Sequence, residues 1–109
     1  MVRAWYSGTM KKFLEESSHE NGVASTAVFA QLNDNAANFS IMPTQRDVWK
    51  EEITLLRDVI WNLHLQGRIY FEYEFPRIGR RADVVLLVKG CLLCLEFKGG
   101  DEAEKPYTM

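Results

Sequence analysis

The sequence lacks an apolar run long enough to cross a membrane, a G-x-x-x-x-G-K-[ST] phosphate loop and any low-complexity segment. A membrane span needs roughly 18 consecutive apolar residues, so no transmembrane segment is expected. The first six residues also lack the apolar stretch of a signal peptide. The missing phosphate loop excludes a nucleotide-driven motor. These absences predict a cytoplasmic protein with no membrane partner.

Positive charge is in slight deficit, with 13 Lys and Arg against 15 Asp and Glu and a net charge of −2. This balance argues against a chain that binds nucleic acid tightly through charge alone. It does not exclude a nuclease, because carboxylates that bind a metal count as negative until the metal arrives. With 109 residues, 47% of them hydrophobic, the chain is expected to form one globular domain.

Cysteine is scarce as well, since only Cys91 and Cys94 are present, in a C-x-x-C pattern. A zinc half-site or a redox pair would be the functional interpretation. However, no second Cys/His pair completes a tetrahedral zinc site. The flanking residues are typical of a buried strand, in which positions i and i+3 point to opposite faces. We therefore predict two buried, inert thiols.

Helical patterns fill residues 1–66. The first predicted helix covers 9–20 and stops before Gly22, and the second covers 23–32 and ends at residues 33–35. Residues 36–43 form a predicted loop. The third and strongest helix begins at a capping box formed by Thr44 and Asp47 and ends near Gly67. Its apolar face has a helical spacing and consists of Trp49, Ile53, Leu56, Ile60 and Leu63.

Strand patterns fill residues 68–98, followed by a short tail at 99–109. The first strand alternates apolar and polar residues and ends at Pro76, with Glu72 and Glu74 on its polar, solvent-facing side. Two apolar runs, 83–88 and 91–98, flank Lys89-Gly90, which predicts a hairpin with a two-residue loop. The chain is thus expected to be a single α/β domain whose helices precede a three-stranded antiparallel meander.

The hairpin loop fixes which residues face each other. If Val88 faces Cys91, then Asp83 faces Glu96, with Cβ atoms about 4.5–5.5 Å apart. Two carboxylates in an apolar setting repel each other, and Mg²⁺ or Mn²⁺ is the simplest partner that would reverse this. Lys98 follows on the same face as Glu96. The alternative is that these residues are charged strand ends, half solvated and paired with Arg81.

Other charged residues are candidates for the same site. On the third helix, Glu52 has apolar neighbours and needs a partner, whereas Glu51 lies on a solvated face. A salt bridge at the helix flank is the alternative for Glu52. The turn before Asp83 carries Arg77, Arg80 and Arg81, which could contact a phosphate backbone or simply be solvated.

The segments 80–87 and 96–98, Arg-Arg-Ala-Asp-Val-Val-Leu-Leu and Glu-Phe-Lys, resemble the PD-(D/E)XK motif of restriction-endonuclease-like nucleases. A closer likeness covers most of the chain and is to the nuclease-like N-terminal region of bacterial superfamily 1 DNA/RNA helicases related to the schlafen group. The residues that carry this closer likeness are Arg3-Ala4-Trp5-Tyr6, Gln45, Trp49, Phe71-Glu72-Tyr73, Pro76-Arg77, Gly79-Arg80-Arg81 and Glu96-Phe97-Lys98.

The resemblance implies a restriction-endonuclease-like core that hydrolyses nucleic acid, DNA in preference to RNA, with Mg²⁺ or Mn²⁺. Asp83, Glu96 and the carbonyl of Phe97 would bind the metal, Lys98 would orient the attacking water, and Glu52 would be the acid on the helix. Members of the superfamily continue into a further helix and strand, but here only residues 99–109 follow Lys98.

The core is therefore expected to be truncated after its third strand. A non-catalytic module that binds nucleic acid or a partner protein is the alternative function. The strand that ends at Lys98 would also expose an edge through which a homodimer could form.

Overall fold

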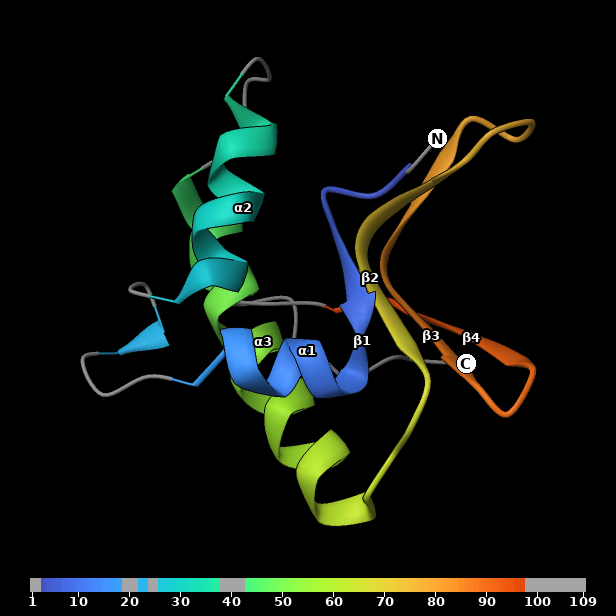
Figure 1. Cartoon of the computed structure of the whole chain (residues 1–109). Coiled ribbons are helices and arrows are strands. Elements are labelled where there is room, and N and C mark those ends of the chain that lie inside the picture. Colours follow the sequence, from blue (N-terminus) through green and yellow to red (C-terminus); the bar gives the residue numbers. More distant parts are fainter. Residues whose placement is uncertain (1–2, 19–21, 24–25, 38–42, 98–109) are drawn as a thin grey trace, which may run out of the picture.

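Three helices pack against one face of a four-stranded antiparallel sheet in the computed structural model, within the residues that it describes, 3–18, 22–23, 26–37 and 43–97 (Figure 1). The elements follow the chain in the order β1 (Tyr6–Thr9), α1 (Met10–Glu16), α2 (Ala27–Ala36), α3 (Pro43–Leu63), β2 (Arg68–Phe75), β3 (Arg80–Val88) and β4 (Cys91–Leu95). The prediction of an α/β chain with helices before a meander is confirmed, with one strand added.

Threonine caps decide where the first two helices begin. The Thr9 Oγ1 atom accepts a hydrogen bond from the Lys12 amide at 3.1 Å, and α1 starts directly after Thr9. Thr26 caps α2 in the same way, through the Phe29 amide. The prediction of a helix over 23–32 was therefore displaced, because the cap lies at Thr26 and the helix continues through residues 33–35 to Ala36.

The long helix α3 starts at Pro43, one residue before the predicted cap Thr44. Proline is tolerated in the first turn, where its missing N–H has no partner to lose. The predicted apolar face is confirmed over four positions, since the side chains of Trp49, Ile53, Leu56 and Ile60 are at most 2% exposed. Leu63, at the last turn, is 65% exposed and does not join the core.

The sheet has the strand order β1-β2-β3-β4. The short strand β1 was not predicted, and it pairs with β2 from Tyr6↔Phe71 to Thr9↔Arg68. Between β3 and β4 the predicted register is confirmed, from Val88↔Cys91 to Val84↔Leu95. Lys89 and Gly90 form the loop with φ of 51° and 78°, the sign that a type I′ hairpin turn requires at both positions.

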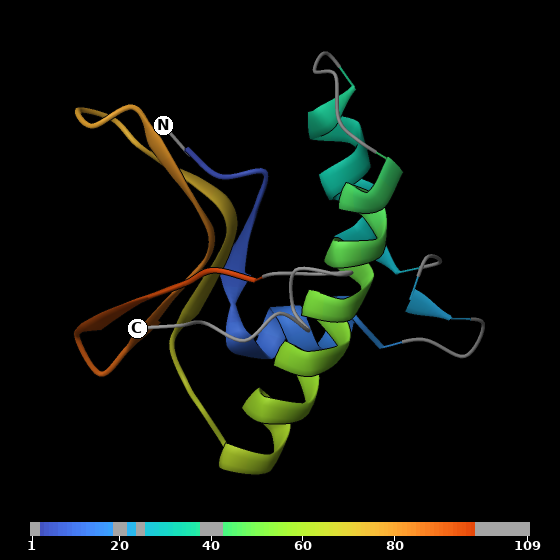
Figure 2. The ribbon, with the colours of Figure 1, turned by 180° about the vertical axis from the view of Figure 1, so that it is seen from behind.

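All three helices cover the same face of the sheet, as the view from behind shows (Figure 2). The core forms between them, from helix residues together with the strand residues Tyr6, Ile69, Phe71, Val84 and Leu86. The outermost strand, β4, is barely covered, and Leu92 and Leu93 are 54% and 47% exposed.

The prediction of two buried thiols was wrong, because Cys91 and Cys94 are both exposed free cysteines. Both belong to β4, which pairs only with β3 among the described strands. None of the described helices combines the length and the apolar content that a membrane crossing requires.

Candidate functional site

The strand β2 changes the face to which its side chains point at Glu72. Before this residue, Ile69 and Phe71 lie in the core and Tyr70 lines a hollow on the opposite, open face. After it, Tyr73 lines the same hollow as Tyr70. The two tyrosines are three positions apart, whereas a regular strand returns to the same face every second residue. Glu72 has a φ of 53°, a left-handed conformation that is rare for a residue other than glycine. Glu72 is therefore turned to the helix side, and its side chain is only 8% exposed.

The prediction that Glu72 is a surface residue was thus wrong. The prediction assumed strict alternation along the strand, which puts Glu72 and Glu74 on the same solvent-facing side. In the structure only Glu74 is exposed. The sequence gives no sign of the positive φ, because Glu is not a residue that usually adopts it. That Trp49 of helix α3 lies next to Glu72 becomes visible only in the folded structure.

Asp83 lies opposite Glu72 on β3 at the same irregularity. The ladder between β2 and β3 includes Phe71↔Val84 and Tyr73↔Ala82 but skips the pair between them. Asp83 is half-buried, and its Oδ2 atom accepts a hydrogen bond from the Phe97 amide at 2.8 Å. This bond ties the segment that follows β4 to β3 beyond the last ladder pair.

Helix α3 contributes Glu52, which the sequence analysis preferred to Glu51. Glu52 is 1% exposed, whereas Glu51 is exposed to solvent. The Oε2 atom of Glu52 is enclosed and has no hydrogen-bond partner among the described residues. A buried polar atom without a partner is costly, and the cost is lower for a protonated carboxyl than for a charged carboxylate.

These three side chains, Glu52, Glu72 and Asp83, are called the carboxylate cluster below. The pKa of Glu52 is raised from 4.5 to about 9. Burial is the largest cause, followed by the negative charges of Asp83, Glu72 and Glu51. Burial also raises the pKa of Glu72, and Asp83 adds to this effect. Like charges disfavour ionisation of their neighbours, so Glu52 is protonated at neutral pH.

Aromatic and basic side chains hold Glu72 in place. Trp49 donates its Nε1 hydrogen to Glu72 Oε1 at 3.3 Å, and this bond opposes the rise in the pKa of Glu72. Trp49 meets Trp5 edge to face at 5.9 Å between ring centroids. The Arg81 guanidinium lies 4.5 Å from the centroid of the Trp5 ring, and its charge also lowers the pKa of Glu72. The cluster is thus bordered by a cation that rests on an aromatic ring.

The remaining predicted residues are placed less favourably. The ladder ends at Val84↔Leu95, one pair short of the predicted Asp83–Glu96 pair. Glu96 is exposed and lines a hollow with Ala82 and Cys94. Lys98 lies outside the described residues. Arg77 and Arg80 are exposed, and Arg80 is the first residue of β3, so the predicted basic turn is shorter than expected.

Within the described residues, no group of three or more His, Cys, Asp or Glu side chains is arranged to hold a metal ion. The chemistry of the donors does suit one, because carboxylate oxygens are the ligands of hard divalent cations. The unpartnered Glu52 Oε2 fits the same interpretation. Of the cluster, Glu52 and Asp83 offer the carboxylate oxygens that such an ion could use, whereas Glu72 is engaged by Trp49.

Comparison with known proteins adds no relative: no protein-family model, no curated protein and no solved structure matches this chain.

Proposed function

We propose that this chain hydrolyses phosphodiester bonds in nucleic acid with the help of Mg²⁺ or Mn²⁺ bound at the carboxylate cluster. The observation that carries the proposal is the enclosed, unpartnered Oε2 atom of Glu52, whose pKa is raised to about 9 by burial and by the nearby charges of Asp83 and Glu72. Three carboxylates repel each other in a buried place unless a cation or a proton is present. A divalent cation would favour their ionised forms together.

Each residue has a role in this proposal. Glu52 and Asp83 supply oxygen ligands, and Glu52 gives up its proton when the ion binds. Glu72 adds negative charge, held in position by Trp49. The bound ion would supply Lewis acidity and a more acidic water. The bond from the Phe97 amide to Asp83 keeps the chain segment before Lys98 next to the cluster. Lys98 is then assigned to orient water and to stabilise negative charge on the phosphate.

The arginines around the start of β3 are assigned to the nucleic acid backbone. Arg77 and Arg80 are exposed, and Arg81 lies at the border of the cluster, where its charge already affects Glu72. Guanidinium groups suit phosphate because their N–H donors form a planar fork. We expect these residues to position the substrate without reading its sequence.

The proposal is tested by titrating the protein with Mn²⁺ at several pH values in a calorimeter. Because Glu52 must lose a proton, we expect affinity to rise with pH up to about 9 and a proton to be released on binding. Asp83→Asn should abolish binding, and Glu52→Gln should remove the pH dependence. Glu51→Gln is the matched control, since Glu51 is exposed on the same helix.

Cleavage is measured on single- and double-stranded DNA and RNA with Mg²⁺ or Mn²⁺. We expect metal-dependent cutting by the native chain, and none by Asp83→Asn or Lys98→Ala with folding intact by circular dichroism. Cutting that survives both substitutions would contradict the assignment of the site. Absence of both cutting and metal binding would contradict the proposal itself.

A non-catalytic module is the second candidate, and two observations favour it. Glu96 is exposed and beyond the last ladder pair, and Asp83 Oδ2 already accepts a hydrogen bond from the Phe97 amide. Such a module would bind nucleic acid or a partner protein without cleaving anything. It predicts that Mn²⁺ has no effect on nucleic acid affinity, whereas the nuclease requires metal for turnover.

A further inference from the structure

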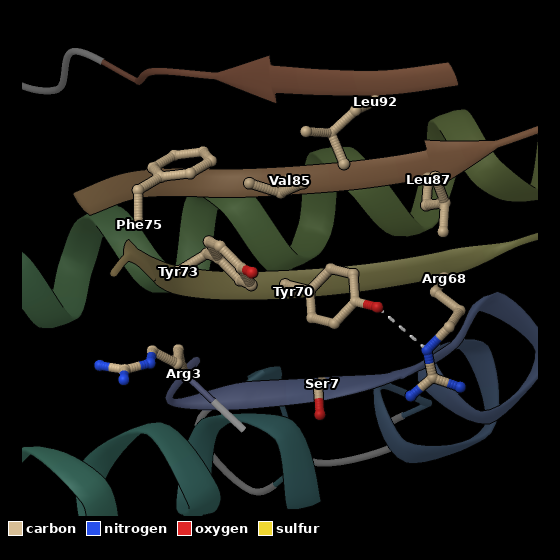
Figure 3. A pocket seen from close by; sticks show the side chains of 9 residues that line it. All are labelled: Arg3, Ser7, Arg68, Tyr70, Tyr73, Phe75, Val85, Leu87 and Leu92. Atoms are coloured by element: carbon tan, nitrogen blue, oxygen red, sulfur yellow. Dashed lines mark hydrogen bonds between the residues drawn. The ribbon is translucent and has the colours of Figure 1, made fainter. Parts of the chain in front are cut away.

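The face of the sheet opposite the helices carries a hollow of about 360 Å³ (Figure 3). Three aromatic side chains of β2 line it, Tyr70, Tyr73 and Phe75. Their position follows from the irregularity at Glu72, because regular alternation would have placed Tyr73 and Phe75 on the side of Phe71. The same backbone feature therefore buries a carboxylate on one face and aligns three rings on the other.

The rings form a continuous row. Tyr70 and Tyr73 meet at 5.5 Å between centroids with an interplanar angle of 71°, and Tyr73 and Phe75 at 5.1 Å with 67°. Figure 3 shows the flat face of Tyr70 open to the viewer and Tyr73 nearly edge-on. All three are half-buried, so they are fixed by the sheet yet reachable from solvent. A fixed aromatic face is a platform on which a nucleobase can stack.

An arginine lies at each end of the tyrosines, Arg3 at one and Arg68 at the other (Figure 3). Arg68 donates its Nε hydrogen to the Tyr70 hydroxyl at 3.2 Å, and no carboxylate pairs with it in the described part of the chain. Arg3 meets Glu74 at 3.8 Å, with both side chains well exposed. Exposed pairs of this kind are weak, so the Arg3 guanidinium can exchange this partner for a phosphate.

The charge of this surface indicates which class of ligand can bind there. The residues that line the hollow include two arginines and no carboxylate, although the whole chain has a net charge of −2. A second copy docked face to face would bring the same arginines together, with no carboxylate among the lining residues to offset them. A polyanion with flat apolar groups complements both the arginines and the rings. A duplex fits poorly, because its bases are stacked on each other and cannot reach the rings.

We propose that this surface binds a short single-stranded segment of DNA or RNA, with bases stacked on Tyr70 and its neighbours and phosphates at Arg3 and Arg68. The inference rests on the proposed function for the class of ligand. It adds that the strand is held on the face of the sheet opposite the carboxylate cluster, and that binding there requires no metal.

The test measures the affinity of the full chain for fluorescent dT₁₂ and rU₁₂ by anisotropy in EDTA, with a duplex of the same length alongside. Arg68→Gln should weaken binding to single strands about tenfold and reduce the dependence of log affinity on log salt by about 0.7. Arg46→Gln, on helix α3, is the matched control and should leave binding unchanged. Tyr70→Leu should also weaken binding about tenfold, whereas Tyr70→Phe, which keeps the ring, should retain most of it.

EDTA separates this inference from the proposed cleavage. Binding that depends on Arg68 and Tyr70 without metal supports the surface even if no substrate is ever cut. Cutting with Mn²⁺ that Arg68→Gln and Tyr70→Leu leave unchanged, together with no binding in EDTA, would overturn the surface while the cleavage proposal stands. Equal loss in Arg46→Gln, or duplex bound as tightly as single strands, would also overturn it. So would a dimer in sedimentation that Arg68→Gln strengthens, which would make this face a contact between copies.

Discussion

Glu52 is a carboxylic acid that the fold keeps neutral. Its side chain is 1% exposed and lies near the negative charges of Asp83 and Glu72. In the unfolded chain its pKa is near 4.5, and in the native state it rises to about 9. The proton that compensates for burial is the one that a metal would have to displace, so the stability of the fold and the proposed chemistry depend on the same group.

This difference predicts how stability varies with pH. Between pH 4.5 and about 9 the unfolded chain has lost the Glu52 proton and the native chain retains it. The unfolded state then binds fewer protons, so the free energy of unfolding falls as pH rises, by an amount on the order of several kcal/mol. Below pH 4.5 this contribution is fully present. Urea unfolding across this range, with Glu52→Gln beside the native chain, measures it.

The expected result is a declining curve for the native chain and a flatter one for Glu52→Gln. Glu51→Gln should stay close to the native curve, because that side chain is exposed and its charge is the smallest of the causes that raise the pKa of Glu52. A native curve that rises between pH 5 and 8 would contradict a buried, neutral Glu52.

A second prediction concerns the stability of variants of Glu72. Its Oε1 atom accepts a hydrogen bond from Trp49, and burial raises its pKa. Glu72→Gln keeps an acceptor for Trp49 and removes a charge near Glu52. We expect this variant to be more stable than the native chain at pH 8 by about 1 kcal/mol. Glu72→Leu, which leaves the Trp49 N–H buried without a partner, should be less stable, and thermal unfolding at pH 8 would rank the three.

The connection between α3 and β2 depends on the backbone of Gly67. Its φ is 140°, and a Cβ atom there would overlap the carbonyl oxygen of Leu87 on β3. Its own carbonyl accepts a hydrogen bond from the Met10 amide at 2.9 Å. Gly67→Ala is therefore expected to lower the free energy of unfolding by more than about 3 kcal/mol.

Gly79 provides the matched control. It also has a positive φ, 69°, but a Cβ atom there meets nothing within 4 Å. Gly79→Ala should cost only about 1–2 kcal/mol, the strain of the left-handed conformation alone. Equal losses for the two variants in urea unfolding would show that the overlap at Gly67 is relieved by movement of β3.

The register of the hairpin of β3 and β4 could be predicted, because Lys89-Gly90 fixes the turn and the turn fixes the register. The ends of the strands could not, since β3 begins at Arg80 and β4 ends at Leu95, before the predicted Asp83–Glu96 pair. The buried face of α3, including Glu52, followed from helical spacing. Strand β1 could not be predicted, since four residues carry too little alternation to stand out. The carboxylate cluster depends on a backbone angle at Glu72 that no local residue type specifies.

Within the described residues, the helices cover one face of the sheet and leave two surfaces open. One is the aromatic face with Arg3 and Arg68. The other is β4, where Leu92 and Leu93 are about half exposed and both cysteines are accessible. Among the described strands, β4 pairs on one side only. An edge strand of this kind is a template for pairing with another chain.

We therefore expect the chain to associate through β4 as its concentration rises, and Leu93→Lys to shift it toward the monomer. A charge on an edge strand opposes strand addition, whereas Leu55→Lys, at a helix residue that is 50% exposed, should leave association unchanged. Sedimentation velocity over a range of concentrations under reducing conditions measures this without disulfide formation at Cys91 and Cys94.

Because Leu93 lies on the opposite side of β4 from Leu92, which lines the aromatic hollow, the same variant should still bind single strands. A monomer at every concentration would contradict the edge contact, and loss of binding in Leu93→Lys would mean that association and nucleic acid binding share one surface.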